Sequence, residues 1–297
     1  MTAFGKRLRI AVGIATSGRA EILGNVVSTI TEQTRQPDSI LICPAKAEDA
    51  GDVLNSHPAI KIVLGRPGLP NQRNTILSHC DADLLLFLDD DFLMQPEYIE
   101  ELEKLFISNP EVVVATGLVK ADGIRGPGFS FEEGRRLLVD LHVDQEPMLR
   151  ETYGGYGCNM ALRLETVRQH GLEFDENLPL YAWLEDIDFS RQLAKYGRVV
   201  KSTMLRGVHL GTKGSGRSSG MRLGYSQIAN PVYLARKGTL SWAFSMKYMR
   251  RQFIANCVRS VKPEPWVDRR GRLKGNILAI YEVLRGRSSP SRILAFK

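Results

Sequence analysis

Long apolar runs and closely spaced cysteines are both missing from this chain of 297 residues. No window approaches the roughly 18 uninterrupted apolar residues that a membrane-spanning helix needs, and the N-terminus lacks the apolar core of a secretory leader. The 4 cysteines are scattered, with no Cys-x-x-Cys spacing. We therefore expect no transmembrane helix, no disulfide framework and no structural zinc, which suits the reducing cytoplasm.

Several motifs of other enzyme classes are missing as well. Gly-x-Gly-x-x-Gly does not follow the first predicted strand and Gly-x-x-x-x-Gly-Lys-Ser/Thr does not occur, which argues against a Rossmann dehydrogenase and a P-loop NTPase. Gly-x-Ser-x-Gly is absent, and no Cys/His pair has a nucleophile context. Covalent catalysis by Ser or Cys is therefore not expected.

The net charge of +7 is concentrated at the C-terminus. Residues 235–297 hold 15 Lys and Arg against 3 Asp and Glu, a net charge of +12. The other 234 residues hold 25 basic and 30 acidic groups, a net charge of −5. A nucleic-acid-binding protein is expected to be basic more evenly. An acidic body with a basic tail favours an enzyme whose C-terminal segment meets an anionic surface.

Apolar runs of strand length alternate with helical patterns along the first two thirds of the chain. This alternation is typical of an α/β fold with a mostly parallel central sheet covered by helices on both faces. Helices are predicted after the first strand and over Leu69–His79, Leu162–His170 and Trp183–Tyr196, and a Gly-rich loop over Gly211–Gly224. Strands are predicted at Leu8–Ile14, Ser39–Cys43, Ala59–Leu64, Leu84–Leu88, Glu111–Val119 and Val199–Val208.

Three consecutive carboxylates, Asp89, Asp90 and Asp91, follow the buried strand at Leu84–Leu88. Three like charges this close repel one another, and a divalent cation removes that cost. Mg²⁺ and Mn²⁺ prefer such oxygen ligands, and ligands of open α/β sheets bind outside the carboxyl ends of strands. If the strand continues, Asp89 and Asp91 point the same way, one for a ribose hydroxyl and one for a metal. The alternative is a polar strand end.

A second acidic segment, Glu185-Asp186-Ile187-Asp188, begins the helix predicted at Trp183–Tyr196. Acids at a helix N-terminus are stabilised by the helix dipole, so a structural interpretation is available. The functional interpretation is a general base that activates a hydroxyl inside a water-poor cleft. We assign Asp186 as this base and Glu185 as a residue that orients the acceptor, and we expect a supporting salt bridge between Asp188 and Arg191.

A histidine and a basic, Gly-rich loop follow the last predicted strand. His209 suits a metal ligand, and the loop after it suits a lid over phosphate groups. The alternative is a solvated hinge with a satisfied histidine. We expect Lys213, Arg217 and Arg222 to supply contacts to an anion, without deciding which of them makes each contact.

These segments together resemble the glycosyltransferases of family 2, which have the GT-A fold. The resemblance extends over about residues 8–237, and its specificity lies in the order and spacing of the motifs rather than in any one of them. The motifs are Ile14–Arg19, Gln33–Pro37, Gly68–Asn74, Phe87–Asp91, Gly157–Arg163 and Glu185–Asp188.

The resemblance implies an inverting transfer of a sugar from a nucleotide-diphosphate sugar to a hydroxyl acceptor, with Mn²⁺ or Mg²⁺. It places Asp186 as the base, and Asp89 and Asp91 as the family's Asp-x-Asp, with His209 as a third metal ligand. Asp90 is assigned to the donor site as its least essential acid. The remaining donor contacts that we expect are Thr16, Ser17, Arg19 and Arg73, together with Lys213 and Arg217 of the loop.

The donor nucleotide is left open by one departure from the family pattern. Many relatives end the second strand with an Asp that reads the base, whereas this chain has Leu41-Ile42-Cys43-Pro44-Ala45, with no acid before Glu48. UDP is the default, and GDP and dTDP stay as alternatives. The acceptor is expected to be a saccharide or lipid-linked saccharide, in exopolysaccharide or glycolipid assembly.

We divide the chain into a catalytic domain, residues 1–237, and a basic helical extension, residues 238–297. Apolar residues recur at helical spacing from Trp242 to Val261, with Lys247, Arg250 and Arg251 on another face. Such a helix can lie on an anionic membrane, which would place the protein on the inner face of the plasma membrane. It can equally pack on the catalytic domain or on a dimer partner.

Two other functions were weighed. A sugar-phosphate nucleotidyltransferase also uses an Asp-bound metal, but usually has a basic Gly-rich loop after the first strand, where this chain has only Ser17-Gly18-Arg19. A non-catalytic protein that binds sugar or nucleic acid through its basic tail is the second alternative. Nucleic acid is not an expected partner of the enzyme.

Overall fold

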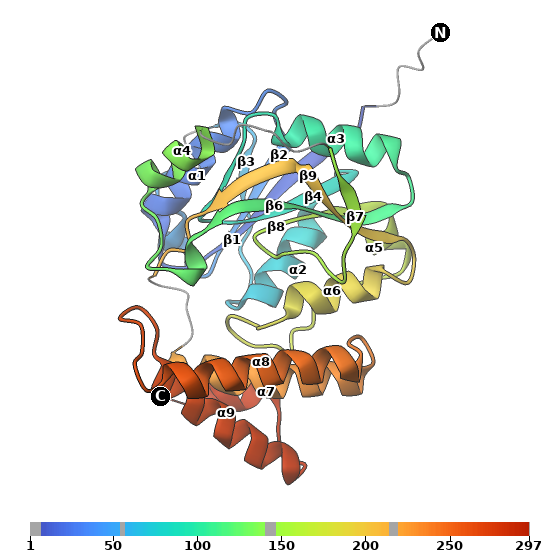
Figure 1. The fold of residues 1–297 in the computed structure, drawn as a ribbon. Helices are drawn as coiled ribbons and strands as arrows, with labels where there is room; N and C mark the ends of the chain where they lie inside the picture. The colour runs from blue at the N-terminus through green and yellow to red at the C-terminus, as the bar shows by residue number, and fades with distance from the viewer. Residues whose placement is uncertain (1–6, 54–56, 140–146, 214–218, 297) are drawn as a thin grey trace.

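The computed structural model describes residues 7–53, 57–139, 147–213 and 219–296. Within these ranges the centre is a nine-stranded sheet of order β3-β2-β1-β4-β8-β6-β9-β5, with β7 paired to β9 (Figure 1). The strands are β1 (Ile10–Thr16), β2 (Ser39–Pro44), β3 (Ile60–Ile62), β4 (Leu84–Asp89), β5 (Phe92–Met94), β6 (Val112–Asp122), β7 (Leu149–Glu151), β8 (Asn159–Arg163) and β9 (Arg198–His209).

Helices cover both faces of this sheet, and three more form a separate layer (Figure 1). Among the described helices, none is both long and apolar enough to cross a membrane. The helices are α1 (Ala20–Thr31), α2 (Leu69–His79), α3 (Tyr98–Ser108), α4 (Phe131–Val139), α5 (Leu164–Gln169), α6 (Glu185–Leu193), α7 (Gly220–Lys237), α8 (Trp242–Arg259) and α9 (Arg269–Leu284), with short 3₁₀ turns η1 (Ala47–Ala50), η3 (Gly123–Arg125) and η4 (Pro290–Ala295).

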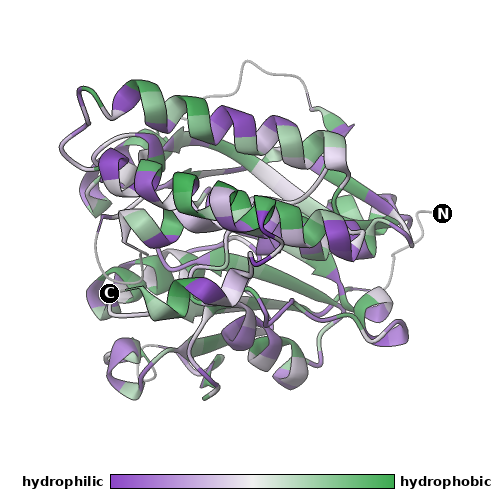
Figure 2. Cartoon of the chain, turned by 90° about the horizontal axis from the view of Figure 1, so that it is seen from below, coloured by the Kyte–Doolittle hydropathy of each residue, from purple (hydrophilic) through white to green (hydrophobic). Residues whose placement is uncertain are grey.

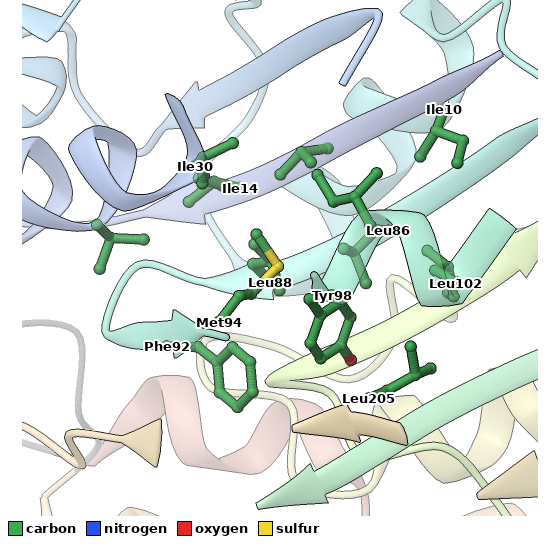
Figure 3. Packing of buried hydrophobic residues seen from close by; sticks show 14 of the residues in the cluster. Ile10, Ile14, Ile30, Leu86, Leu88, Phe92, Met94, Tyr98, Leu102 and Leu205 are labelled. Atoms are coloured by element: carbon green, nitrogen blue, oxygen red, sulfur yellow. The ribbon is translucent and has the colours of Figure 1, made fainter. Parts of the chain in front are cut away.

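Alternate residues of the central strands enter two different cores, because side chains of a strand point to opposite faces. Leu86 and Leu88 pack with Tyr98 and Leu102 of α3 on one face, as Figure 3 shows. The residue between them, Phe87, packs on the other face with helices α2, α5 and α6. Strands buried on both faces read as continuous apolar runs, which is why the sequence predicted them.

The direction of the strands brings several chain segments to one edge of the sheet. β1 is parallel to β2 and β4, β8 runs antiparallel between β4 and β6, and β6 is parallel to β9. The carboxyl ends of β1, β4, β6 and β9 therefore meet at the same edge as the start of β8. The last residues of the four strands are Thr16, Asp89, Asp122 and His209.

The layer of α7, α8 and α9 has its own small core and lies beyond α2 and α6 (Figure 1). Its interior also holds a buried amide network, in which Asn256 Nδ2 donates to Gln227 Oε1 over 2.9 Å and to Asn276 Oδ1 over 2.8 Å. α7 joins this layer to the catalytic part, since Asn230 Nδ2 donates to the Trp183 carbonyl over 2.9 Å. The predicted domain boundary at 237/238 lies at the end of α7 and therefore separates α7 from α8 and α9, with which it shares a core.

The predicted α/β class, central sheet and C-terminal helices are confirmed. Some local predictions were wrong: the helix predicted from Leu162 starts at Leu164, because β8 continues to Arg163, and α7 occupies the end of the predicted Gly211–Gly224 loop. The strands β5, β7 and β8 were missed. All three are short and make antiparallel pairs, so only their distant partners define them.

The crossing of α7 and α9 predicts a sensitive glycine. A Cβ built on Gly275 would lie 2.2 Å from the Met221 carbonyl oxygen and 2.6 Å from the Tyr225 nitrogen, both backbone atoms that cannot move alone. We expect Gly275→Ala to lower the free energy of unfolding by about 1–3 kcal/mol, as overpacking does. Urea unfolding followed by circular dichroism measures it. Gly126→Ala is the matched control, because nothing lies within 4 Å of its Cβ; equal stability of the two variants would contradict the close crossing.

Candidate active site

Asp89, Asp91 and His209 meet at the sheet edge where β4 and β9 end. One ligand atom from each lies within 4.8 Å of the others, and His209 Nε2 is 3.2 Å from Asp91 Oδ1 and 3.8 Å from Asp89 Oδ2. Adjacent ligands of an octahedral ion with bonds of about 2.1 Å are about 3 Å apart, so these residues fit a divalent cation. β4 ends at Asp89, so the condition that the strand continues through Asp91 is not met. After the turn at 90–91, both acids still face His209.

Asp91 is the most enclosed member of this cluster. Its Oδ2 accepts from the Thr212 nitrogen over 2.9 Å and lies 3.4 Å from Arg19 Nη1. Burial raises the pKa of Asp91, but His209, Arg19 and the Thr212 amide outweigh burial and lower it well below the usual range. Asp91 is therefore ionised at neutral pH, as a carboxylate that binds a cation must be.

His209 is held by a carboxylate that the sequence analysis did not single out. Asp122, at the end of β6, accepts from Nδ1 over 2.9 Å and also from the Tyr156 hydroxyl over 3.1 Å. Burial lowers the pKa of His209, but Asp122, Asp91 and Asp89 outweigh burial and raise it to about 10. A divalent cation would replace that proton at Nε2 while Nδ1 keeps its bond to Asp122.

Asp90 points away from the cluster, toward β1. It is fully buried, with Arg19 Nη2 at 2.6 Å and a 2.6 Å hydrogen bond from Thr16 Oγ1. Burial raises the pKa of Asp90 to about 7, against the pull of Arg19. Thr16 and Arg19, which are predicted with Asp90 to contact the donor, thus both bind Asp90. Ser17 lies half-buried in the adjoining turn.

Arg73 links the two acidic segments through the interior. Only 2% exposed, it donates to Glu185 Oε1 over 2.7 Å and to the Gly157 carbonyl over 2.8 Å, and its Nη2 is 3.5 Å from Asp89 Oδ1. Its guanidinium lies over the rings of Phe87 and Phe174. Burial raises the pKa of Glu185 to about 8, while Arg73 opposes the shift.

Asp186 is the carboxylate of this segment that reaches the surface. It is partly exposed, and its oxygens accept from the Gly157 nitrogen over 2.9 Å and from the Ile187 nitrogen over 2.8 Å. Burial raises its pKa, although these two amides and Arg73 oppose the shift. The preceding Leu184 has a left-handed φ of 73°, a strained conformation of the kind that clusters at functional sites.

The predicted salt bridge between Asp188 and Arg191 is wrong. Asp188 is fully buried and pairs with Lys237 Nζ of α7 at 2.8 Å, because it faces the end of that helix. Arg191 instead lies over the ring of Tyr153, 4.7 Å from its centroid. The sequence did not show which helix packs on this face of α6.

The predicted anion-binding residues lie in different places. Lys213 Nζ, close to the cluster, donates to the carbonyls of Gly123 and Ile124 over 3.2 and 2.9 Å. Arg222 Nε, on α7, donates to the Phe296 carbonyl over 3.1 Å. Arg217 lies outside the described residues.

Two contacts of the site were not predicted from the sequence. Asp122 binds His209, and the Gly157 nitrogen donates to Asp186. Asp122 follows an apolar strand, the same signal that singled out Asp89. The predicted strand ends at Val119, whereas β6 continues to Asp122. Gly157 belongs to a recognised motif, but its bonds to Asp186 and Arg73 depend on the fold.

Solved structures similar to this one include two that are described in complex with nucleotide sugars. The mannosyltransferase PcManGT from Pyrobaculum calidifontis, in complex with GDP-Man and Mn²⁺, is 15% identical with a TM-score of 0.57, over 98% of this chain and 86% of that chain. Residues 1–349 of S. aureus TarS, in complex with UDP-GlcNAc, are 14% identical with a TM-score of 0.60, over 96% and 83%. At these identities the likeness shows the fold alone.

Sequence comparison gives the family. No curated protein sequence matches significantly. The family model described as glycosyl transferase family 2 matches residues 11–170, more than half of the chain, which includes the Asp triplet and ends before Asp186. The chain therefore belongs to glycosyl transferase family 2, and the protein is a glycosyltransferase with the GT-A fold.

Proposed function

We propose that this enzyme transfers a sugar, with inversion, from a nucleotide-diphosphate sugar to a hydroxyl of a saccharide or lipid-linked saccharide. One observation carries the proposal. A partly exposed carboxylate with a raised pKa, Asp186, lies near the Asp89, Asp91 and His209 cluster. The Gly157 residue links them, because its nitrogen donates to Asp186 and its carbonyl accepts from Arg73, which lies 3.5 Å from Asp89. Displacement of a diphosphate by a hydroxyl needs a base to accept the proton of the hydroxyl and a nearby site to hold the diphosphate, and this arrangement offers both.

The donor's diphosphate belongs at the cluster of Asp89, Asp91 and His209. These residues would hold Mn²⁺ or Mg²⁺, which, when bound, neutralises charge that develops on the leaving diphosphate. Asp89 is the most exposed of the three and is the one placed to reach a ribose hydroxyl. Lys213, whose ammonium lies near the end of β6, and Arg217 are the basic groups that we assign to the phosphates.

Asp186 accepts the proton of the acceptor hydroxyl as its oxygen attacks the anomeric carbon. The new bond forms opposite the bond to the diphosphate, which breaks with its electron pair, so the configuration inverts without a covalent intermediate. The Gly157 and Ile187 amides fix the carboxylate in place, and its raised pKa makes it a stronger base than an ordinary Asp. Glu185 is buried and accepts from Arg73, so we assign it to holding the segment in position instead of to the acceptor, the role expected from the sequence.

An aromatic wall beside Asp186 is our candidate acceptor surface. Trp183 lies 6.0 Å from Tyr248 between ring centroids, and its Nε1 has no hydrogen-bond partner among the residues that the structure describes. Burial raises the pKa of Tyr248 to about 12, with a contribution from the charge of Asp186. Such a wall offers aromatic faces, which suit a saccharide of an exopolysaccharide or glycolipid.

UDP is the favoured nucleotide of the donor. The end of β2 supplies no acid to read a base, since Glu48 is exposed and the buried Asp49 accepts from the Lys46 nitrogen over 3.1 Å. Similar solved structures are described with GDP-Man and with UDP-GlcNAc. The choice among UDP, GDP and dTDP as the nucleotide is therefore tested by the following experiment.

Replacement of Asp186 by Asn separates catalysis from donor binding. Without the base, we expect turnover to fall by at least about 100-fold, the lower end for general base catalysis. Thermal shifts with UDP-, GDP- and dTDP-sugars, with and without Mn²⁺, should show one donor that raises the melting temperature equally in both proteins. Unchanged turnover in the variant would overturn the base, and the absence of any donor-induced shift would overturn the proposed donor class.

The pH dependence of the reaction follows from the raised pKa of Asp186. The base must be ionised, so kcat/KM falls as the pH drops through that pKa, and the acid limb should lie above the ordinary Asp value of about 4. Initial rates at saturating Mn²⁺ measure the profile without loss of metal at low pH. An acid limb at the ordinary Asp value would contradict this role.

Removal of the support for His209 should weaken metal binding. Asp122 holds the ring so that Nε2 faces Asp91, and loss of such a partner typically costs about 10–100-fold in metal affinity. We expect this loss of Mn²⁺ affinity in Asp122→Asn by isothermal titration calorimetry. The exposed Asp81→Asn serves as the control. Equal affinities in the two variants would remove Asp122 from the site.

A further inference from the structure

An apolar groove lies between the three C-terminal helices, away from the strand ends that form the active site. Its volume is about 630 Å³. We call it the helical groove and define it by its apolar lining and three basic residues. The apolar lining is Ile228 and Val232 of α7, Trp242, Met246, Met249 and Phe253 of α8, and Ile280, Val283 and Leu284 of α9.

The polar residues that line the helical groove are all cations: Arg236, Lys247 and Arg250. Within the part of the chain that the structure describes, none of the three forms a salt bridge, whereas the neighbouring Lys237 pairs with Asp175 and Asp188. The whole segment from residue 235 carries a net charge of +12. The groove therefore combines an apolar floor with a surplus of positive charge.

Large apolar side chains of the groove are left in water. Trp242 is 51% exposed, Met246 58% and Leu284 82%. Exposed apolar residues are ordinary when they are scattered, but a patch around a hollow marks a binding surface. Figure 2, seen from the side of this layer, shows hydrophobic and hydrophilic residues interspersed along its helices.

The position of α8 is fixed by its other face. Phe244 stacks on Tyr153 with 4.3 Å between ring centroids, and Tyr248 packs against Trp183. These contacts hold α8 on the catalytic part beside Asp186. Trp242, Met246 and Phe253 line the groove instead, so one helix serves both surfaces.

We propose that the helical groove binds an anionic phospholipid of a bilayer surface, with hydrocarbon against its apolar lining and the phosphate at Arg236, Lys247 and Arg250. The positive charge of the groove favours an anionic occupant. A second copy would bring together two segments of +12, and a neutral lipid would leave the three cations without a counter-charge. Basic residues beside aromatic and aliphatic ones are the features of surface-bound membrane helices. The proposal does not rest on the reaction that the enzyme catalyses.

Flotation of the full chain with vesicles tests the proposal. We expect binding to vesicles of phosphatidylcholine with phosphatidylglycerol and at least tenfold weaker binding to phosphatidylcholine alone. Met246→Glu puts a carboxylate into the groove and should weaken binding at least tenfold. Ile277→Glu is the matched control, because Ile277 is 55% exposed on α9 and outside the groove lining.

A pair of charge variants separates the groove from net charge. Lys247→Gln with Arg250→Gln removes two groove cations, which we expect to weaken binding about 30-fold if each contributes as a basic residue at an anionic surface does. Arg251→Gln with Lys274→Gln removes the same charge outside the groove lining and should have a smaller effect.

Equal losses in the matched variants, or binding indifferent to phosphatidylglycerol, would overturn the proposal. Sedimentation velocity without lipid covers the other occupant: a dimer that Met246→Glu dissociates would assign the groove to a second copy. Circular dichroism and the donor-induced thermal shift establish that each variant is folded. Whether or not the protein binds these vesicles, the result does not bear on the proposed sugar transfer, which the Asp186→Asn experiment tests.

Discussion

Repulsion between carboxylates at one edge of the sheet is the constraint on which the rest of this structure depends. The strand directions bring Asp89, Asp91 and Asp122 together, with Asp186 and Glu185 close by. Like charges this close would raise one another's pKa and destabilise the fold unless cations compensate. Arg19, Arg73 and His209 supply the compensation, each enclosed by the acids it serves.

The compensation is arranged so that some acids stay available to ligands. Arg73 binds Glu185 and the Gly157 carbonyl inside the protein, and Arg19 binds Asp90. Asp89 and Asp186, in contrast, remain partly exposed to solvent. Burial alone would neutralise these groups. The result is an edge where the Asp89, Asp91 and His209 cluster and the Glu185–Asp186 segment are linked by the buried Arg73, which pairs with Glu185 and lies 3.5 Å from Asp89.

The C-terminal helices are tied to the acidic helix α6. Lys237 of α7 pairs with the buried Asp188, so the layer is bonded to the helix that carries Asp186. α8 then adds Phe244 and Tyr248 to the aromatic wall and presents its remaining apolar residues to the groove. The basic C-terminal segment is therefore a structural part of the enzyme, and the surface that we propose for anionic lipid lies on the same helices.

The sequence by itself determined the α/β alternation, the Asp triplet and Asp186, because apolar periodicity and runs of acids are local properties of a chain. It did not reveal β8, Asp122 as the partner of His209, or Lys237 as the partner of Asp188. Each of these depends on which strand ends and helix faces meet, and that is decided by pairings between residues far apart in the chain. Residue type thus indicated the chemistry, while the tertiary structure chose the partners, since a carboxylate's pKa and contacts belong to its surroundings.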